Sequence, residues 1–219
     1  MKKYKILNLY ACLGGNRYKW DEVADNLEIT AVELDPEAAR LYKERFPQDE
    51  VIIADAHQYL LDHYKEFDFI WSSPPCPTHS KSRYWAFGKT MPVYPDMKLY
   101  EEIIFLKYHF TGKWVVENVN PYYEPMYNPV IRERHTYWSN FQIPNKISNR
   151  NDTALVQASK LQDLCDFHDY DFRKYKGEQR VLKMARNLVD YEAGKTILQT
   201  ALNIYEKNNT TQKTIFDEM

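Results

Sequence analysis

A cysteine follows directly on an apolar run, residues 67–71, and on the turn Ser72–Pro75. Prolines cannot extend a central strand, so the run is expected to end there and to deliver Cys76 at the carboxyl end of a buried strand. Open α/β sheets bind their ligands at this edge. Because cysteine attacks as the thiolate, Cys76 is a candidate nucleophile that needs neighbouring groups to promote its ionisation.

An acid closes an earlier expected strand. Residues 29–35 contain Glu33, about 20 residues after the pair Gly14-Gly15, which is the spacing at which Rossmann-like folds bind ribose hydroxyls. The glycine turn follows a strand at 5–10 and is expected to lead into a polar helix through about residue 26, so that backbone amides can face a ligand. Glu33 could instead neighbour the cap of the next helix, but the glycine turn favours the ribose interpretation.

Expected strands and helices alternate along the first half of the chain. The strands are 5–10, 29–35, 51–55, 67–71 and 113–119, and the helices between them include 37–46, 57–64 and 96–111. This alternation predicts a doubly wound, Rossmann-like α/β sheet. Beyond it, residues 130–141 alternate like antiparallel strands, and residues 179–186 and 191–206 have the pattern of helices.

Composition excludes several classes of protein. The 219 residues are 44% apolar and 27% charged, which is typical of one soluble domain with a sizeable core. The net charge of −2 means that any nucleic-acid binding needs a local patch. The chain has no apolar run of membrane length and no metal-ligand spacing, and its three cysteines favour a reducing cytoplasm. We therefore expect a cytoplasmic monomer that uses neither a membrane nor a metal.

Seven segments, taken in order, resemble the cytosine-5 DNA methyltransferase family, which uses S-adenosylmethionine. They are Leu9–Gly15, Glu33–Asp35, Ala54-Asp55, Pro75–Ser80, Glu117–Val119, Arg132–Arg134 and Arg186–Val189. Only Glu117–Val119 matches the family outright. The chain departs from the family's usual residue at seven positions: Asn8 (usually Asp), Cys12 (Gly), Pro77 (Gln), His79 (Phe), Val130 (Gln), Arg186 (Gly) and Leu188 (Ser).

The resemblance implies a site. Its catalytic residues would be Cys76, Glu117, Asn118 and Arg134. Its cofactor-binding residues would be Tyr10, Ala11, Gly14, Gly15, Glu33, Leu34, Asp55, Pro75, Asn187 and Val189. Cys76 would add to carbon 6 of a flipped cytosine while Glu117 holds ring nitrogen 3 and the amino group, so that carbon 5 can accept a methyl group.

The resemblance also implies a division of the chain. Residues 1–141 would form the catalytic core, 142–176 a small, irregular target-recognition region, 177–206 helices that complete the core, and 207–219 a flexible tail. Such a short recognition region resembles compact members typical of phage and mobile elements, including restriction-modification systems. Residues 77–95 would form a lid. DNA contacts would come from Ser80, Lys81, Arg83, Arg132, Arg173 and Lys174.

Three alternatives remain at this point. Ser73–Cys76 differs only in its last residue from a Ser-Pro-Pro-Tyr type motif, which belongs to enzymes that methylate exocyclic amino groups; Glu117-Asn-Val and the arginine pair argue against that reading. The same chemistry could act on RNA, because at least one tRNA methyltransferase resembles this family. The departures at residues 8, 12 and 130 also suit a non-catalytic, methyltransferase-like protein that binds nucleic acid.

Overall fold

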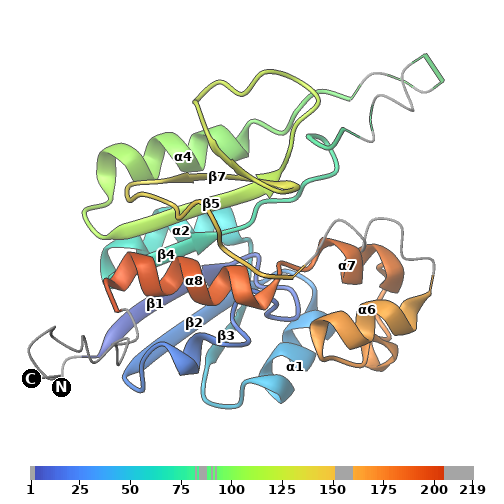
Figure 1. The fold of residues 1–219 in the computed structure, drawn as a ribbon, viewed down its shortest axis with the longest axis horizontal. Coiled ribbons are helices and arrows are strands. Elements are labelled where there is room, and N and C mark those ends of the chain that lie inside the picture. The colour runs from blue at the N-terminus through green and yellow to red at the C-terminus, as the bar shows by residue number, and fades with distance from the viewer. Residues whose placement is uncertain are drawn as a thin grey trace, which may run out of the picture.

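The computed structural model describes residues 3–204 except 82, 84–87, 90, 92 and 151–159 (Figure 1). Within these residues a seven-stranded sheet has the order β3-β2-β1-β4-β5-β7-β6. The strands are β1 (Tyr4–Leu9), β2 (Leu27–Glu33), β3 (Glu50–Ile53), β4 (Phe69–Ser72), β5 (Lys113–Val119), β6 (Val130–Arg132) and β7 (His135–Ser139). The first five pair in parallel, and β7 runs antiparallel to both β5 and β6. The prediction of a Rossmann-like α/β fold is confirmed.

Helices cover both faces of this sheet. They are α1 (Pro36–Arg45), α2 (Ala56–His63), α4 (Lys98–His109), α6 (Leu161–His168), α7 (Val181–Asn187) and α8 (Tyr191–Leu202), with short 3-10 turns η1 (Trp20–Glu22), η2 (Tyr64–Glu66) and η3 (Phe172–Lys174). Within the described ranges, every helix is too short or too polar to cross a lipid bilayer.

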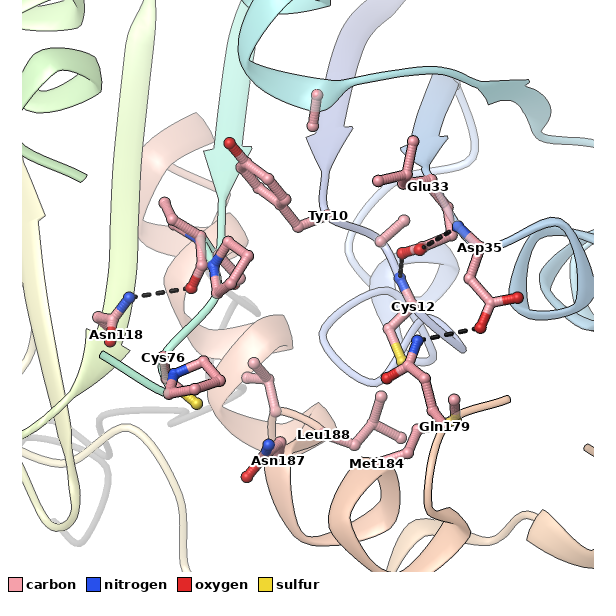
Figure 2. Close-up of a pocket in the computed structure, with 18 of the residues that line it drawn as sticks. Tyr10, Cys12, Glu33, Asp35, Cys76, Asn118, Gln179, Met184, Asn187 and Leu188 are labelled. Atoms are coloured by element: carbon pink, nitrogen blue, oxygen red, sulfur yellow. Dashed lines mark hydrogen bonds between the residues drawn. The ribbon is translucent and has the colours of Figure 1, made fainter. Parts of the chain in front are cut away.

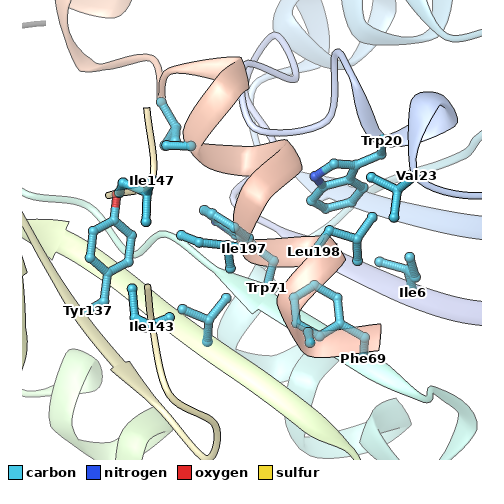
Figure 3. Packing of buried hydrophobic residues seen from close by; sticks show 14 of the residues in the cluster. Ile6, Trp20, Val23, Phe69, Trp71, Tyr137, Ile143, Ile147, Ile197 and Leu198 are labelled. Carbon is cyan, nitrogen blue, oxygen red and sulfur yellow. The ribbon is translucent and has the colours of Figure 1, made fainter. Parts of the chain in front are cut away.

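Alternate strand residues build two hydrophobic layers, because successive side chains in a strand point to opposite faces. On one face Ile6, Phe69 and Trp71 pack against Ile197 and Leu198 of α8 (Figure 3). On the other face the strands pack against α2 and α4. That layer includes Leu7, Ile70, Val116, Leu60 and Ile103. The two layers hold the carboxyl ends of β1, β4 and β5 side by side.

Aspartates that follow the strands cap the next helices. Asp35 Oδ1 accepts the amide of Glu37 at 2.9 Å at the start of α1, where Pro36 occupies the first helical position. Asp55 Oδ1 accepts the amide of Gln58 at 2.9 Å at the start of α2. These caps satisfy amides that helix starts leave unpaired, and they fix both acids at the sheet edge.

The prediction of a polar helix from the glycine turn to about residue 26 is wrong. The structure has turns there and the short η1. Side chains of this segment make tertiary contacts instead: Trp20 is fully buried and its Nε1 donates to the carbonyl of Gly194 at 3.1 Å. Arg17 Nε donates to Asp49 Oδ2 at 2.8 Å. These contacts outweigh a weak local helical preference.

The segment 142–176 is not wholly irregular, because its described part contains α6 and η3. This part lies beside α1 (Figure 1). Arg45 Nη2 donates to the carbonyl of His168 at 3.2 Å, and Lys174 Nζ lies 2.8 Å from Glu44 Oε1. Residues 160–176 therefore pack on the β2–α1 side of the molecule. The expected tail at 207–219 and much of the expected lid lie outside the described residues.

Candidate active site

A cavity of about 840 Å³ opens at the carboxyl ends of β1, β2, β4 and β5, between the sheet and α7 (Figure 2). All four expected catalytic residues line it: Cys76, Glu117, Asn118 and Arg134. The expected cofactor residues that line it are Tyr10, Ala11, Gly15, Glu33, Leu34, Asp55, Pro75, Asn187 and Val189. Segments from seven separate places in the chain thus meet at one site.

The backbone around Cys76 is held in a tight turn after β4. Asn118 Nδ2 donates to the carbonyl of Pro74 at 2.9 Å, which ties the residue before the Pro75-Cys76 pair to β5. The carbonyl of Cys76 accepts the amides of His79 at 3.0 Å and Ser80 at 3.1 Å. The thiol is therefore fixed at the cavity wall, with little freedom in the main chain that carries it.

Charges around the Cys76 thiol act in opposite directions. Burial raises the pKa of Cys76, and the charge of Glu117 raises it further, whereas Lys183 and Arg134 lower it. The net direction is upward, so the thiol stays protonated near neutral pH until the balance changes. A nucleophilic role requires a step that either neutralises Glu117 or reinforces the cations.

Glu117 is itself poised to change charge. It is 6% exposed, and burial raises its pKa to about 7, against a hydrogen bond from Ser73 and the charge of Arg134, which lower it. His135 Nε2 lies 3.7 Å from Glu117 Oε1. A carboxyl with this pKa exists in both forms at neutral pH, so it can donate a hydrogen bond to a ring nitrogen when protonated.

The two arginines of the Arg132–Arg134 segment point to different partners. Arg134 lines the cavity, and its Nη2 donates to the carbonyl of Arg186 at 3.0 Å, which links the β6–β7 turn to α7. Arg132 does not line the cavity. Its Nε donates to the carbonyl of Pro144 at 2.6 Å and its Nη2 to the carbonyl of Ile143 at 3.2 Å. Arg132 therefore anchors the chain that follows β7.

The acid at the end of β2 binds backbone amides. Glu33 Oε2 accepts the amide of Cys12 at 2.8 Å, and Oε1 accepts the amide of Asp35 at 2.8 Å. Cys12 has a φ of 47°, a left-handed conformation that explains why a glycine is usual at this position. Burial raises the pKa of Glu33, although both amides oppose this. Each carboxylate oxygen retains acceptor capacity for a ligand hydroxyl.

The two glycines of the turn are required by protein packing. A Cβ on Gly15 would lie 2.5 Å from both Leu188 Cγ and the carbonyl oxygen of Val189. A Cβ on Gly14 would lie 2.3 Å from Phe46 Cε2, and Gly14 does not line the cavity. The turn therefore packs directly on α1 and on the residues after α7, and this close packing shapes the cavity from both sides.

A buried carboxylate supports the floor of the cavity from behind. Glu102 of α4 is fully buried and accepts the hydroxyls of Tyr10 at 2.6 Å and Ser72 at 2.5 Å, and its Oε1 lies 3.1 Å from His57 Nδ1. It joins the carboxyl ends of β1 and β4 to α2 and α4. Spacing alone does not mark this residue, because Glu102 falls within an amphipathic helix whose other charges are exposed.

These residues fit S-adenosylmethionine. The volume is in the range of small-molecule sites. Glu33 ends β2 and Asp55 follows the neighbouring β3, and both offer carboxylate oxygens to hydroxyl or amino donors. Tyr10 and Leu188 contribute apolar surface. The thiol of Cys76 lines the same cavity, so a base bound there could lie beside the cofactor's methyl group. No group of three metal-ligating side chains occurs among the residues that the structure describes.

The expected nucleic-acid contacts lie outside the cavity. Ser80 forms a β-bridge with Pro121, and Lys81 is exposed beside it. Arg83 Nε donates to the carbonyl of Pro77 at 2.8 Å. On the other side of the cavity, Arg173 Nε lies 2.6 Å from Asp171 Oδ1, and Lys174 binds Glu44 as described above.

Several cavity residues cannot be identified from the sequence pattern. Lys183 and Met184 come from the first turns of α7, and Gln179 precedes that helix. Nothing in their spacing distinguishes them from an ordinary solvated helix face. The resemblance to the family at Arg186–Val189 was the available signal, because it places the end of the same helix at the cofactor site.

The sheet order β3-β2-β1-β4-β5-β7-β6 is typical of the Rossmann-like methyltransferase fold. Residues 4–125, more than half of the 219, match the family described as C-5 cytosine-specific DNA methylase. The chain belongs to this family. Membership implies the use of S-adenosylmethionine and a nucleic-acid substrate.

Among the similar solved structures, one supports the fold. The methyltransferase EhMeth of Entamoeba histolytica has a TM-score of 0.54 and 10% identity, over 93% of this chain and 99% of that chain. DNMT2 of Spodoptera frugiperda is 26% identical with a TM-score of 0.40, over 53% of this chain and only 36% of its own. A putative DNA modification methyltransferase from an Escherichia coli prophage is 16% identical with a TM-score of 0.39, over 56% and 34%. No curated protein matches.

Proposed function

We propose that the protein transfers a methyl group to carbon 5 of cytosine in DNA, by way of a covalent adduct between Cys76 and a flipped base. The observation that supports this most is that Cys76 and Glu117 line one cavity together with the strand-end acid Glu33. The first two residues suit the base, and the third suits the ribose of the cofactor. A base must leave the duplex to reach such an enclosed thiol.

Each residue has a distinct role in the proposed reaction. The Cys76 thiolate forms a bond to carbon 6, which makes carbon 5 an enamine carbon that can attack an electrophile. Protonated Glu117 donates to ring nitrogen 3 and takes up the charge change on the ring. Arg134 donates to the exocyclic oxygen, and Asn118 holds the Pro74 carbonyl and with it the turn that carries the thiol.

The bound cofactor would supply an electrophilic sulfonium methyl group. Around it, Glu33 accepts from ribose hydroxyls and Asp55 from the edge of the adenine, while Tyr10, Ala11, Leu34, Pro75, Asn187 and Val189 enclose the rest. Once carbon 5 carries the methyl group, its proton would pass to a water molecule, and the electron pair of that C–H bond re-forms the double bond between carbons 5 and 6. The bond between Cys76 and carbon 6 then breaks, and its electron pair returns to the sulfur.

Nucleic acid would approach from outside the cavity. We assign phosphate contacts to Ser80, Lys81, Arg83, Arg132, Arg173 and Lys174, which lie beyond the cavity on several segments around it. Residues 1–141 and 177–206 then form the catalytic core, and 142–176 contributes a small recognition surface. Phosphate contacts position a substrate, whereas base contacts specify it, so we expect limited sequence selectivity.

One experiment tests the function and its alternatives together. The protein is incubated with methyl-labelled cofactor and duplex DNA, single-stranded DNA or tRNA, and the products are hydrolysed to nucleosides. Labelled 5-methyldeoxycytidine supports the proposal. Labelled 5-methylcytidine from tRNA moves the same chemistry to RNA. Label on an exocyclic amino group overturns the covalent mechanism, and absence of label from all substrates, with the cofactor bound, supports a non-catalytic protein.

A further inference from the structure

A short segment before α7 binds the acid that caps α1. Tyr175 Oη donates to Asp35 Oδ2, and Gln179 Nε2 donates to the same oxygen at 3.0 Å (Figure 2). The amide of Gln179 donates in turn to Tyr175 Oη at 3.2 Å. The amide of Lys176 donates to Glu37 Oε1 at 3.3 Å. Both ends of segment 175–179 are therefore attached to the β2–α1 connection.

The segment is shaped for this attachment. Tyr175 is 3% exposed and packs in a core cluster that includes Leu164 of α6 and Met184 of α7. A Cβ on Gly177 would lie 2.1 Å from Tyr175 Oη, so a glycine is needed for the chain to pass that close to the hydroxyl. Against the effect of burial, the hydrogen bonds from Tyr175 and Gln179 hold the pKa of Asp35 below its ordinary value. Asp35 therefore stays ionised and keeps its two donors at neutral pH.

The attached segment forms a wall of the cavity. Gly177 and Gln179 line it together with Glu33, Leu34 and Asp35, which are the residues at the ribose end of the proposed cofactor site. Figure 2 shows Gln179 reaching Asp35 from the side of the cavity opposite β1. This wall comes from the boundary of the region expected to recognise DNA.

We propose that residues 175–179 are a latch that binds the nucleoside part of S-adenosylmethionine, held closed by the bonds from Tyr175 and Gln179 to Asp35. The proposal rests on the proposed use of that cofactor. A latch at this place explains why residues 160–176 pack against α1: they hold in place the segment that lines the cofactor site. It also makes this region a binding element for a nucleoside, separate from any contact with DNA.

The test measures binding, so it does not depend on turnover. Gln179→Ala and Tyr175→Phe each remove one donor to Asp35, and the second keeps the buried ring. Titration calorimetry with S-adenosylhomocysteine and with 5′-methylthioadenosine, which lacks the amino-acid part, should show affinity reduced about tenfold for both ligands, as expected for one lost hydrogen bond to a charged group. The matched control Glu44→Gln removes the contact of α1 with Lys174, the residue just before the segment and outside the cavity, and should leave both affinities unchanged.

Protease protection gives a second readout. Trypsin cleavage after Lys176, which is exposed, should slow when S-adenosylhomocysteine is bound to the wild type, and should slow less in Gln179→Ala.

Wild-type affinities in both variants would overturn the latch and leave the proposed function intact. A loss of affinity for duplex DNA alone would show that the segment serves the substrate. A wild type that binds neither S-adenosylmethionine nor its product would overturn the proposed function and the latch with it.

Discussion

Cys76 and Glu117 lie in one cavity, and each ionised group disfavours the other. Burial is the main cause of the raised Cys76 pKa, and the Glu117 carboxylate adds to it. Burial also raises the pKa of Glu117 to about 7. When Glu117 takes up a proton, it loses the charge that opposes the thiolate and gains the hydrogen that a ring nitrogen needs. The protonation state that suits the base therefore also suits the nucleophile.

The first prediction follows from this relationship. Glu117→Gln should lower the pKa of the Cys76 thiol, because the amide occupies nearly the same volume without the charge. Above pH 7, where the wild-type carboxyl is ionised, iodoacetamide should alkylate Cys76 faster in the variant. The rate is followed by mass spectrometry of the Cys76 peptide, since Cys12 and Cys165 are also free thiols. Unchanged or slower alkylation would show that Glu117 does not control the thiol.

The second prediction concerns the opposing cation. Lys183 lines the cavity. The charge of Lys183 lowers the pKa of Cys76 by more than the charge of Arg134 does. Lys183→Met should therefore slow alkylation of Cys76 at a fixed pH, and Lys183→Arg should restore it. Lys65→Gln is the control, because that lysine lies on η2, outside the cavity. If the Met and Arg variants behave alike, the charge of Lys183 has no role in activating the thiol.

The third prediction is the effect of Glu117 on stability as pH changes. Its folded-state pKa of about 7 lies above its ordinary 4.5, so between these values the folded protein holds a proton that the unfolded chain has lost. This contribution to the free energy of unfolding is complete below pH 4.5 and lost as pH rises through about 7, at a cost of about 3 kcal/mol. Urea unfolding at pH 5 and pH 8 should therefore show a larger fall for wild type than for Glu117→Gln. Parallel falls would contradict the raised pKa.

The positions of the parallel strands along the chain could be predicted from the sequence for a physical reason. Buried parallel strands are nearly continuous apolar runs. The run of β4 stops before Pro74, because proline cannot donate to a ladder, and the run of β5 stops at Glu117-Asn118, which need partners in a dry interior. Expected and observed bounds agree within two residues for all of β1 to β5. The residues that carry charge at the strand ends therefore identified the sheet edge and most of the cavity.

What the sequence did not reveal depends on contacts between distant segments. Trp20 and Arg17 fit a polar helix equally well until their partners Gly194 and Asp49 are known. The side chains that donate to Asp35 are separated from it by about 140 residues in the sequence, so no local pattern shows that the acid binds them. Gly15 lines the cavity, but its sequence neighbours do not show that Leu188 and Val189 provide the atoms nearest to its missing Cβ.

The fourth prediction tests the covalent step. Cys76→Ala should abolish methylation and leave the affinity for S-adenosylhomocysteine within about twofold of wild type, because the thiol is proposed to touch the base and not the cofactor. Wild type should form a denaturation-resistant adduct with DNA that contains 5-fluorocytosine, since fluorine cannot leave carbon 5 as a proton does, and the variant should form none. Methylation by Cys76→Ala would favour transfer to an amino group.

The fifth prediction separates the cations proposed to contact phosphate. Each phosphate contact releases counterions, so its loss should lower the slope of log affinity against log salt by about 0.9 for duplex DNA. Arg173 and Lys174 already face Asp171 and Glu44, and a phosphate would have to replace those carboxylates. Exposed ion pairs are weak, so replacement is feasible but reduces the net gain. We therefore expect Lys81→Glu to weaken binding more than Lys174→Glu, nearly equally for all DNA sequences. Fluorescence anisotropy at several salt concentrations measures both slopes, and a larger effect at Lys174 would place the nucleic acid on the α6 side of the cavity.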